Sequence, residues 1–103
     1  QLLCSDNRLE SLEISGCEDL SRLECSGNLL TSLNTSNNTE LWQLYCGYNQ
    51  ITTLDLTNNS KIYQLAIDHM PMLTKVCVWA LPFTGSAYTD GSPNFYFTTD
   101  CSK

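Results

Sequence analysis

The stretch LECSGNLLTSL, residues 23–33, decides the fold because its pattern recurs along the chain. The stretch LYCGYNQITTL (44–54) repeats its Leu, Cys and Asn positions 21 residues later. The stretch LLCSDNRLESL (2–12) carries them 21 residues earlier. The consensus of one unit is L-x-C-x-x-N-x-L-x-x-L-x-L-x-x-N-x-x-L. Self-similarity at a short fixed period indicates a solenoid in which each unit forms one coil.

The paired Leu and Cys of each unit predict a short strand, because side chains two residues apart lie on the same face of a strand. The inward positions are Leu2, Leu23, Leu44 and Leu65, followed by Cys4, Cys25, Cys46 and Ile67. The returning arms carry Ser, Thr and Asn without helical periodicity. We therefore predict a leucine-rich-repeat solenoid that is mainly β, with a parallel sheet on one face, extended or 3₁₀ convex arms, and little α-helix.

Two polar columns accompany the leucines. We expect Asn7, Asn28 and Asn49 to form a buried ladder, because a side-chain amide satisfies both donors and acceptors where the chain turns away from its strand. The second column consists of Cys17, Asn38 and Asn59. It should support the opposite turn, with Cys17 as a small buried substitute for Asn.

The repeat divides the chain into two parts. Residues 1–69 contain about three 21-residue units, and residues 70–103 are expected to form a final partial repeat and a C-terminal cap. Residues 95–97 are a candidate strand of the cap, and we expect its core to contain Trp79, Phe83, Phe95 and Phe97. Because residue 1 already lies within a repeat, we also expect the natural protein to continue upstream.

The six cysteines fall into different classes. Cys4, Cys25 and Cys46 share one inward column, where neighbouring Cβ atoms lie near the ~4.8 Å strand spacing and not the ~3.8 Å of a disulfide. We expect them to be reduced, and we expect no zinc there because no C-x-x-C pair and no His lies in register. Cys77 and Cys101 lie outside the column, and the sequence leaves open whether they are bridged.

Composition excludes several classes of function. Five Lys and Arg residues against eleven acidic residues, in a chain of 103 residues with a net charge of -6, provide no basic stripe for nucleic acid. No apolar run is long enough to cross a bilayer, so we expect no membrane insertion by this segment. No motif indicates a cofactor.

We expect no enzymatic activity. Asp68 and the single histidine, His69, should point to opposite faces if the strand continues there, and His69 is interpreted as a surface residue at a turn. Glu10 and Glu13 lie on a return arm and are interpreted as solvated charges. The segment 90–94 resembles a calcium loop but lacks its alternating acidic spacing, so we interpret it as a plain turn.

The outward residues flanking the Leu and Cys positions define a candidate binding face. Its candidate contact residues are Arg22, Glu24, Gln43, Tyr45, Gln64 and Asp68, and its other members are Leu3, Ser5, Ser26, Gly47 and Ala66. Tyr45, Arg22 and Glu24 are expected to mark the contact patch, because Tyr and Arg most often anchor protein interfaces. The alternative is a solvated face, with the true ligand site on other coils.

The pattern L-x-C-S-x-N-x-L-x-S-L of residues 23–33, with Cys-Val-Trp (77–79) and GSPNFYFTTDC (91–101), resembles a known family. The chain is similar to the cysteine-ladder, 21-residue leucine-rich repeats of the internalin type, especially surface or secreted repeat proteins of Bacteroides-like bacteria. It departs from that pattern at Cys17, Thr35 and Ile67. The resemblance implies an extracellular or cell-surface bacterial adhesion module that recognises a protein ligand, and we expect a monomer. A carbohydrate-binding surface using Tyr45, Tyr48 and Tyr63 and a structural spacer are the alternatives.

Overall fold

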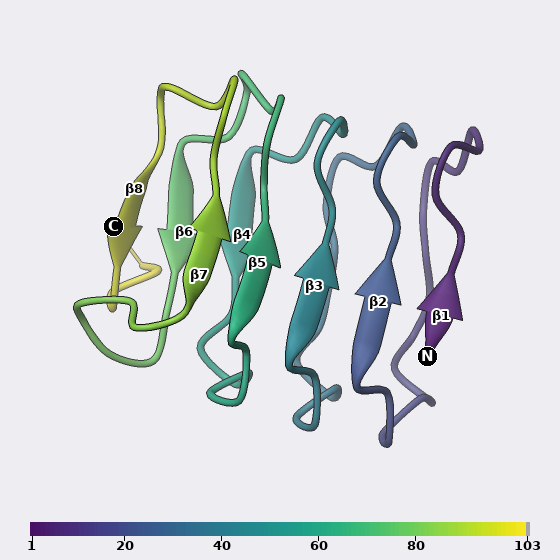
Figure 1. Cartoon of the computed structure of the whole chain (residues 1–103), viewed down its shortest axis with the longest axis horizontal. Coiled ribbons are helices and arrows are strands. Elements are labelled where there is room, and N and C mark those ends of the chain that lie inside the picture. The colour runs from purple at the N-terminus through teal and green to yellow at the C-terminus, as the bar shows by residue number, and fades with distance from the viewer. Residues whose placement is uncertain (103) are drawn as a thin grey trace.

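The computed structural model describes residues 1–102 and shows a β-solenoid of about five turns built from parallel strands (Figure 1). Sheet A has the strand order β1 (Leu2–Leu3), β2 (Arg22–Glu24), β3 (Gln43–Tyr45), β5 (Gln64–Ala66) and β7 (Ser86–Tyr88). Sheet B consists of β4 (Thr53–Asp55), β6 (Lys75–Cys77) and β8 (Tyr96–Thr98). Residues 1–102 form no helix, and therefore none with the length and apolar character needed to span a membrane.

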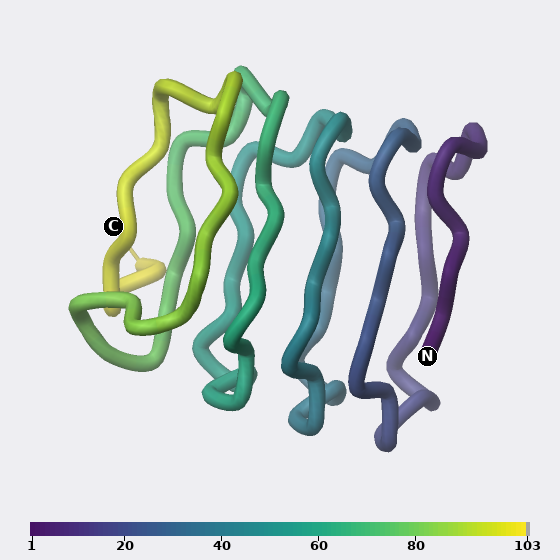
Figure 2. The backbone as a smooth tube through the Cα atoms, in the orientation of Figure 1, coloured from purple at the N-terminus to yellow at the C-terminus, as the bar shows by residue number. Residues whose placement is uncertain are grey.

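The chain winds through the two sides of the solenoid once per coil, as the backbone tube shows (Figure 2). We number the coils 1 (residues 1–21), 2 (22–42), 3 (43–63), 4 (64–85) and 5 (86–102). The cross-strand register places Leu2 beside Leu23, Leu23 beside Leu44, and Leu44 beside Leu65. The predicted column of inward leucines is therefore confirmed, because the 21-residue period returns each leucine to the same point of the coil.

The core lies between sheet A and the returning arms of the coils, three of which form sheet B. Leucine, isoleucine and valine side chains from both sides of each inner coil fill it, and Leu23, Leu44 and Leu54 are fully buried. A single coil has no second layer of its own to cover its apolar side, so each coil depends on its neighbours for burial. The fold is therefore stabilised mainly by contacts between successive coils.

The convex arms follow the extended alternative of the prediction and also form a second sheet, which the sequence did not predict. No 3₁₀ turn occurs in residues 1–102, and the arms of coils 3, 4 and 5 pair as a second parallel sheet. Leu54 lies beside Val76, and Val76 lies beside Phe97. The arms of coils 1 and 2 carry Leu12 and Leu33 at the equivalent inward positions but form no strand.

The predicted Asn ladder forms in the inner coils. The side-chain amide of Asn49 donates to the carbonyl groups of Cys25 and Cys46, both at 3.0 Å, and its Oδ1 accepts from the backbone N–H of Leu30 at 3.0 Å. Asn28 makes the equivalent bonds to Cys4, Cys25 and Leu9. Each Asn therefore ties its own coil to the coil before it.

The expectations for the first coil need correction. Asn7 is exposed, Cys4 is only half-buried, and Cys17 is exposed where we expected a buried substitute. The ladder bonds run from each Asn back to the preceding coil, and residues 1–102 include no coil before coil 1. The columns are therefore buried from coil 2 onward, where Asn28, Asn38, Asn49 and Asn59 have little or no exposure.

Residues 70–102, for which we expected a partial repeat and a cap, extend both sheets. β7 pairs with β5 and β8 pairs with β6, so this segment supplies a further coil and the last strand of each sheet. The expected strand at 95–97 is present as Tyr96–Thr98. The four aromatic residues expected in the cap core do pack together and against the main core: Trp79, Phe83, Phe95 and Phe97.

Candidate functional site

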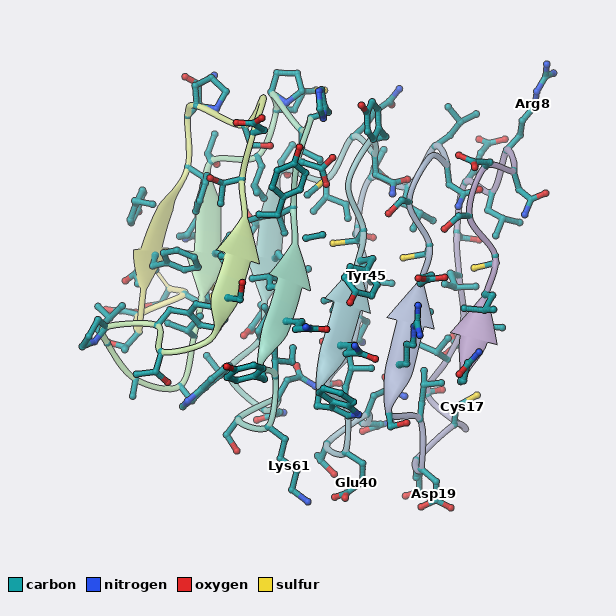
Figure 3. The ribbon with its side chains drawn as sticks, viewed as in Figure 1. Arg8, Cys17, Asp19, Glu40, Tyr45 and Lys61 are labelled. Atoms are coloured by element: carbon teal, nitrogen blue, oxygen red, sulfur yellow. A yellow bond between two sulfur atoms is a disulfide. The ribbon has the colours of Figure 1, made fainter. Side chains whose placement is uncertain are left out.

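The outer face of sheet A carries the candidate binding residues. The central residue of each of the strands β2, β3 and β5 is buried, while its two neighbours are half-buried on the opposite side. Tyr45 lies near the middle of this face, on β3 (Figure 3). Gly47 departs from the expectation because it is buried, with Asp68 of the next coil lying against the space a side chain would occupy.

Arg22 and Glu24 form an ion pair on β2. Nη2 of Arg22 lies 2.7 Å from Oε1 of Glu24, and the guanidinium carbon lies 5.7 Å from the centre of the Tyr45 ring. The hydrogen bond to Glu24 raises the pKa of Arg22. The structure thus brings together the three residues expected to mark the contact patch, with Arg22 held by a carboxylate and an aromatic face.

Two glutamines link β3 to β5 beside Tyr45. The amide of Gln43 donates to Oε1 of Gln64, and the Tyr45 hydroxyl donates to the same oxygen at 2.8 Å. The Gln43 amide also lies 3.3 Å from the Tyr45 hydroxyl oxygen. These bonds connect neighbouring coils and hold the Tyr45 ring in one position on the face.

Asp68 and His69 lie at the edge of this face, just beyond β5, and they correct the expectation that their side chains diverge. The strand ends at Ala66, and His69 adopts a φ of 53°. The turn therefore brings Nδ1 of His69 to 3.0 Å from Oδ2 of Asp68. The His69 ring also stacks on Tyr48, with ring centres 4.2 Å apart, so His69 is an exposed turn residue that joins two coils.

Trp42 and Tyr63 are exposed aromatic residues immediately before β3 and β5. They have 43% and 59% of their surface exposed and lie in equivalent positions of successive coils. They belong neither to the core nor to the aromatic cluster of Trp79, Phe83, Phe95 and Phe97. Trp42 was not among the predicted face residues, because strand alternation from Gln43 would point it inward; it is exposed because the strand begins only at Gln43.

The cysteines of the described residues do not form a group of ionised thiols that could bind a metal ion. Cys25 and Cys46 are buried and reduced, and burial raises the pKa of Cys25 to about 12. Cys77 and Cys101 form a disulfide with a Cα–Cα distance of 5.4 Å, which answers the question the sequence left open. Their sulfurs lie near Asp55, but two sulfurs bonded to one another do not supply the thiolates that zinc requires.

The other candidates for chemistry lie apart from the face. Glu10 and Glu13 are exposed on the arm of coil 1, and hydrogen bonding to Ser15 lowers the pKa of Glu13. Ser92, within the segment interpreted as a turn, is buried, donates to the carbonyl of Ile67 at 2.6 Å and accepts from the N–H of Met70 at 2.8 Å. It therefore acts as a core support equivalent to the ladder Asn residues.

No protein-family model, no curated protein and no solved structure matches the chain.

Proposed function

We propose that this chain is a non-catalytic binding module that recognises a protein ligand through the outer face of sheet A. We further propose that it is a leucine-rich-repeat solenoid of the internalin type, from a bacterial surface or secreted protein. The repeated Leu, Cys and Asn positions and the terminal motif at residues 91–101 support this assignment by resemblance. The β-solenoid of parallel strands is compatible with it.

The observation that carries the proposal is that contacts within the chain already hold the long side chains of this face in place. Arg22 is held by Glu24 and the Tyr45 ring, and Tyr45 is held by Gln64. Ordering a long side chain on binding costs about 0.5–1.5 kcal/mol. Side chains already fixed in the free protein avoid part of that cost, so the face is arranged for recognition before a partner arrives.

The residue types of the face fit a protein partner. Tyr and Arg are enriched at energetically important positions of protein interfaces; Tyr45 lies near the middle of this surface (Figure 3), and Arg22 lies over its ring. The face is a half-buried sheet surface without a deep cavity at Tyr45, where the hollow beside it measures only about 150 Å³. Sites for drug-sized molecules usually measure about 300–1,000 Å³.

A carbohydrate ligand is the second candidate, supported by Trp42 and Tyr63. Their exposed rings lie next to Gln43 and Gln64, so apolar surfaces and amide groups adjoin each other on successive coils. This combination suits a sugar, which presents both an apolar ring face and hydroxyl groups. This site would lie at the edge of sheet A nearest the strand starts.

Selection from a displayed library of random peptides tests the main proposal. We expect peptides that bind the wild-type chain and lose binding to a variant carrying Gln43→Ala, Tyr45→Ala and Gln64→Ala. The matched control replaces Thr53, Lys75 and Tyr96, which form the corresponding row of sheet B, by Ala. Selected peptides that bind the sheet A variant and the sheet B control equally would contradict the proposal. Selected peptides whose affinity is unchanged for Tyr45→Ala and Arg22→Ala would contradict it as well.

A glycan array tests the second candidate. We expect any bound glycan to lose affinity for Trp42→Ala and Tyr63→Ala while keeping its affinity for Tyr96→Ala, which removes a similarly exposed ring from sheet B. Glycan binding that depends on Trp42 and Tyr63, together with an unproductive peptide selection, would favour the carbohydrate function over the protein-binding one.

A further inference from the structure

A narrow slot lies between two tyrosines on the outer face of sheet A. Tyr45 of β3, Ala66 of β5 and Tyr88 of β7 are direct neighbours in one cross-strand row. Two tyrosines therefore stand two strand spacings apart, about 10 Å, with a methyl group between them. The slot is the hollow of about 150 Å³ described above, and the other residues that line it are Gln64, Leu65 and Ser86.

The size of the slot favours one flat side chain as its occupant. Stacked groups pack at about 3.5–4 Å, so two tyrosines whose Cα atoms lie about 10 Å apart can accept one planar group between their side chains. Tyr88 has 53% of its surface exposed, so this wall of the slot is open to solvent. A whole folded ligand would cover the slot, and one of its side chains would enter it.

Charge favours a cationic occupant. Asp90 lies near the Tyr88 hydroxyl and, together with Asp68, raises the pKa of Tyr88. Among the described residues, no cation forms an ion pair with Asp90. The chain as a whole carries a net charge of -6. The tyrosine at one side of the slot therefore lies beside a carboxylate, Asp90, that is paired with no cation among the described residues.

Tyr45 already interacts with one cation. The guanidinium of Arg22 lies over its ring from the coil 2 side, while the slot lies on the side of coils 4 and 5. Aromatic rings attract Arg and Lys through the negative charge on their faces. The arrangement within the chain thus shows the type of contact that a partner would repeat on the far side of Tyr45.

We infer that this slot, the Tyr45–Tyr88 slot, binds a basic side chain of the protein partner, with arginine fitting best. Its guanidinium would stack between the two rings over Ala66 and extend toward Asp90. This inference rests on the proposed protein-binding function and specifies the chemistry of the partner. A planar, delocalised cation fits better than lysine because it can stack on an aromatic face and donate to a carboxylate at once.

Titration with short peptides tests the slot directly. The probes are acetyl-Gly-Arg-Gly-amide and its citrulline counterpart, which keeps the shape and removes the charge. In ¹⁵N nuclear magnetic resonance spectra, we expect the arginine peptide to shift the amide signals of Ala66, Ser86 and Tyr88. We expect the citrulline peptide to bind about two- to fivefold more weakly, as loss of an exposed cation–π contact predicts.

Three variants locate the binding. Ala66→Leu fills the slot and should abolish the shifts, while Tyr88→Leu and Asp90→Asn should each weaken binding. Thr53→Leu on sheet B is the matched control for Ala66→Leu and should leave binding unchanged. A dispersed spectrum like that of the wild type verifies that each variant is folded.

Several outcomes would overturn the inference. They are equal binding of the arginine and citrulline peptides, shifts centred elsewhere, or retained binding by folded Ala66→Leu. Failure of the proposed function has a different signature. The arginine peptide would then bind the slot, while no peptide from the displayed library depended on the row Gln43, Tyr45 and Gln64.

Discussion

The Thr35 hydroxyl donates a 2.8 Å hydrogen bond to Oδ1 of the buried Asn59 in the next coil. One coil earlier, Ile14 occupies the equivalent position, and Oδ1 of the buried Asn38 has no donor among the described residues. Thr35, which departs from the apolar column of the repeat, therefore completes the hydrogen bonding of a ladder residue. A buried polar atom without a partner costs about 1–3 kcal/mol.

Thr35→Val should lower the free energy of unfolding by about 1–3 kcal/mol, because it leaves Oδ1 of Asn59 unpaired without changing the size of the side chain. Chemical denaturation followed by tryptophan fluorescence measures this change. At position 14, the same comparison should favour Thr over Val, because a hydroxyl there would reach Oδ1 of Asn38. Greater stability of Ile14→Val than Ile14→Thr would show that Asn38 gains nothing from a donor at this position.

Asn49→Ala should destabilise the chain by more than about 3 kcal/mol. The substitution removes one acceptor and the donors to two buried carbonyl groups, each of which costs about 1–3 kcal/mol when left unpaired. Asn7→Ala is the control, because Asn7 is exposed and bonds only within its own coil. We expect it to cost less than about 1 kcal/mol, and similar losses in the two variants would contradict the ladder.

The cysteine ladder should make stability fall at alkaline pH. The folded state raises the pKa of Cys25 to about 12 through burial, while an unfolded thiol ionises near ~8.5. This stabilising contribution is complete below the unfolded pKa and is lost as pH rises from there toward about 12. Between pH ~7 and ~10, we expect the wild type to lose about 2 kcal/mol more than Cys25→Ala.

Thiol alkylation provides an independent check on the same cysteines. At mildly alkaline pH, iodoacetamide should modify the exposed Cys17 first, while the buried Cys25 and Cys46 stay neutral and unreactive in the folded chain. Mass spectrometry of peptides after timed labelling identifies the modified positions. Equal labelling rates at Cys17 and Cys46 would show that the ladder is open to solvent.

The disulfide should stabilise the last coil. Cys77 and Cys101 are 24 residues apart, and closing a loop of this size in the unfolded chain is worth about 3 kcal/mol in the chain-entropy model. Cys101→Ser should therefore lower the free energy of unfolding by about 3 kcal/mol. Cys17→Ser, which removes an exposed thiol, serves as the control and should have little effect.

Some structural positions escaped the sequence comparison because their residue types vary. A column of left-handed residues precedes the Asn ladder and consists of Asp6, Gly27, Tyr48, His69 and Gly91. Backbone conformation is conserved there while the side chain changes, so a search for repeated residue types does not find it. Met70 likewise follows Asn49 by 21 residues and is fully buried, so an apolar side chain stands where the ladder would continue.

The sequence by itself determined the coil. Leu23 and Leu44 recur at a fixed period, and Cys25 and Cys46 recur with them. The inward face followed from side-chain alternation, and the register between coils followed from the period. The predicted neighbours Arg22, Glu24 and Tyr45 also followed, because the period places equivalent positions of successive coils side by side.

Only the tertiary structure decided what happens at the ends and between the coils. The exposure of Asn7 and Cys17 depends on whether another coil covers them. The row of Tyr45, Ala66 and Tyr88 includes a step of 22 residues from Ala66 to Tyr88, which differs from the period of 21. The pairing of the arms in sheet B likewise depends on backbone contacts between coils. A periodic pattern specifies what each coil presents to its neighbours, whereas burial and pairing arise from which neighbours are present.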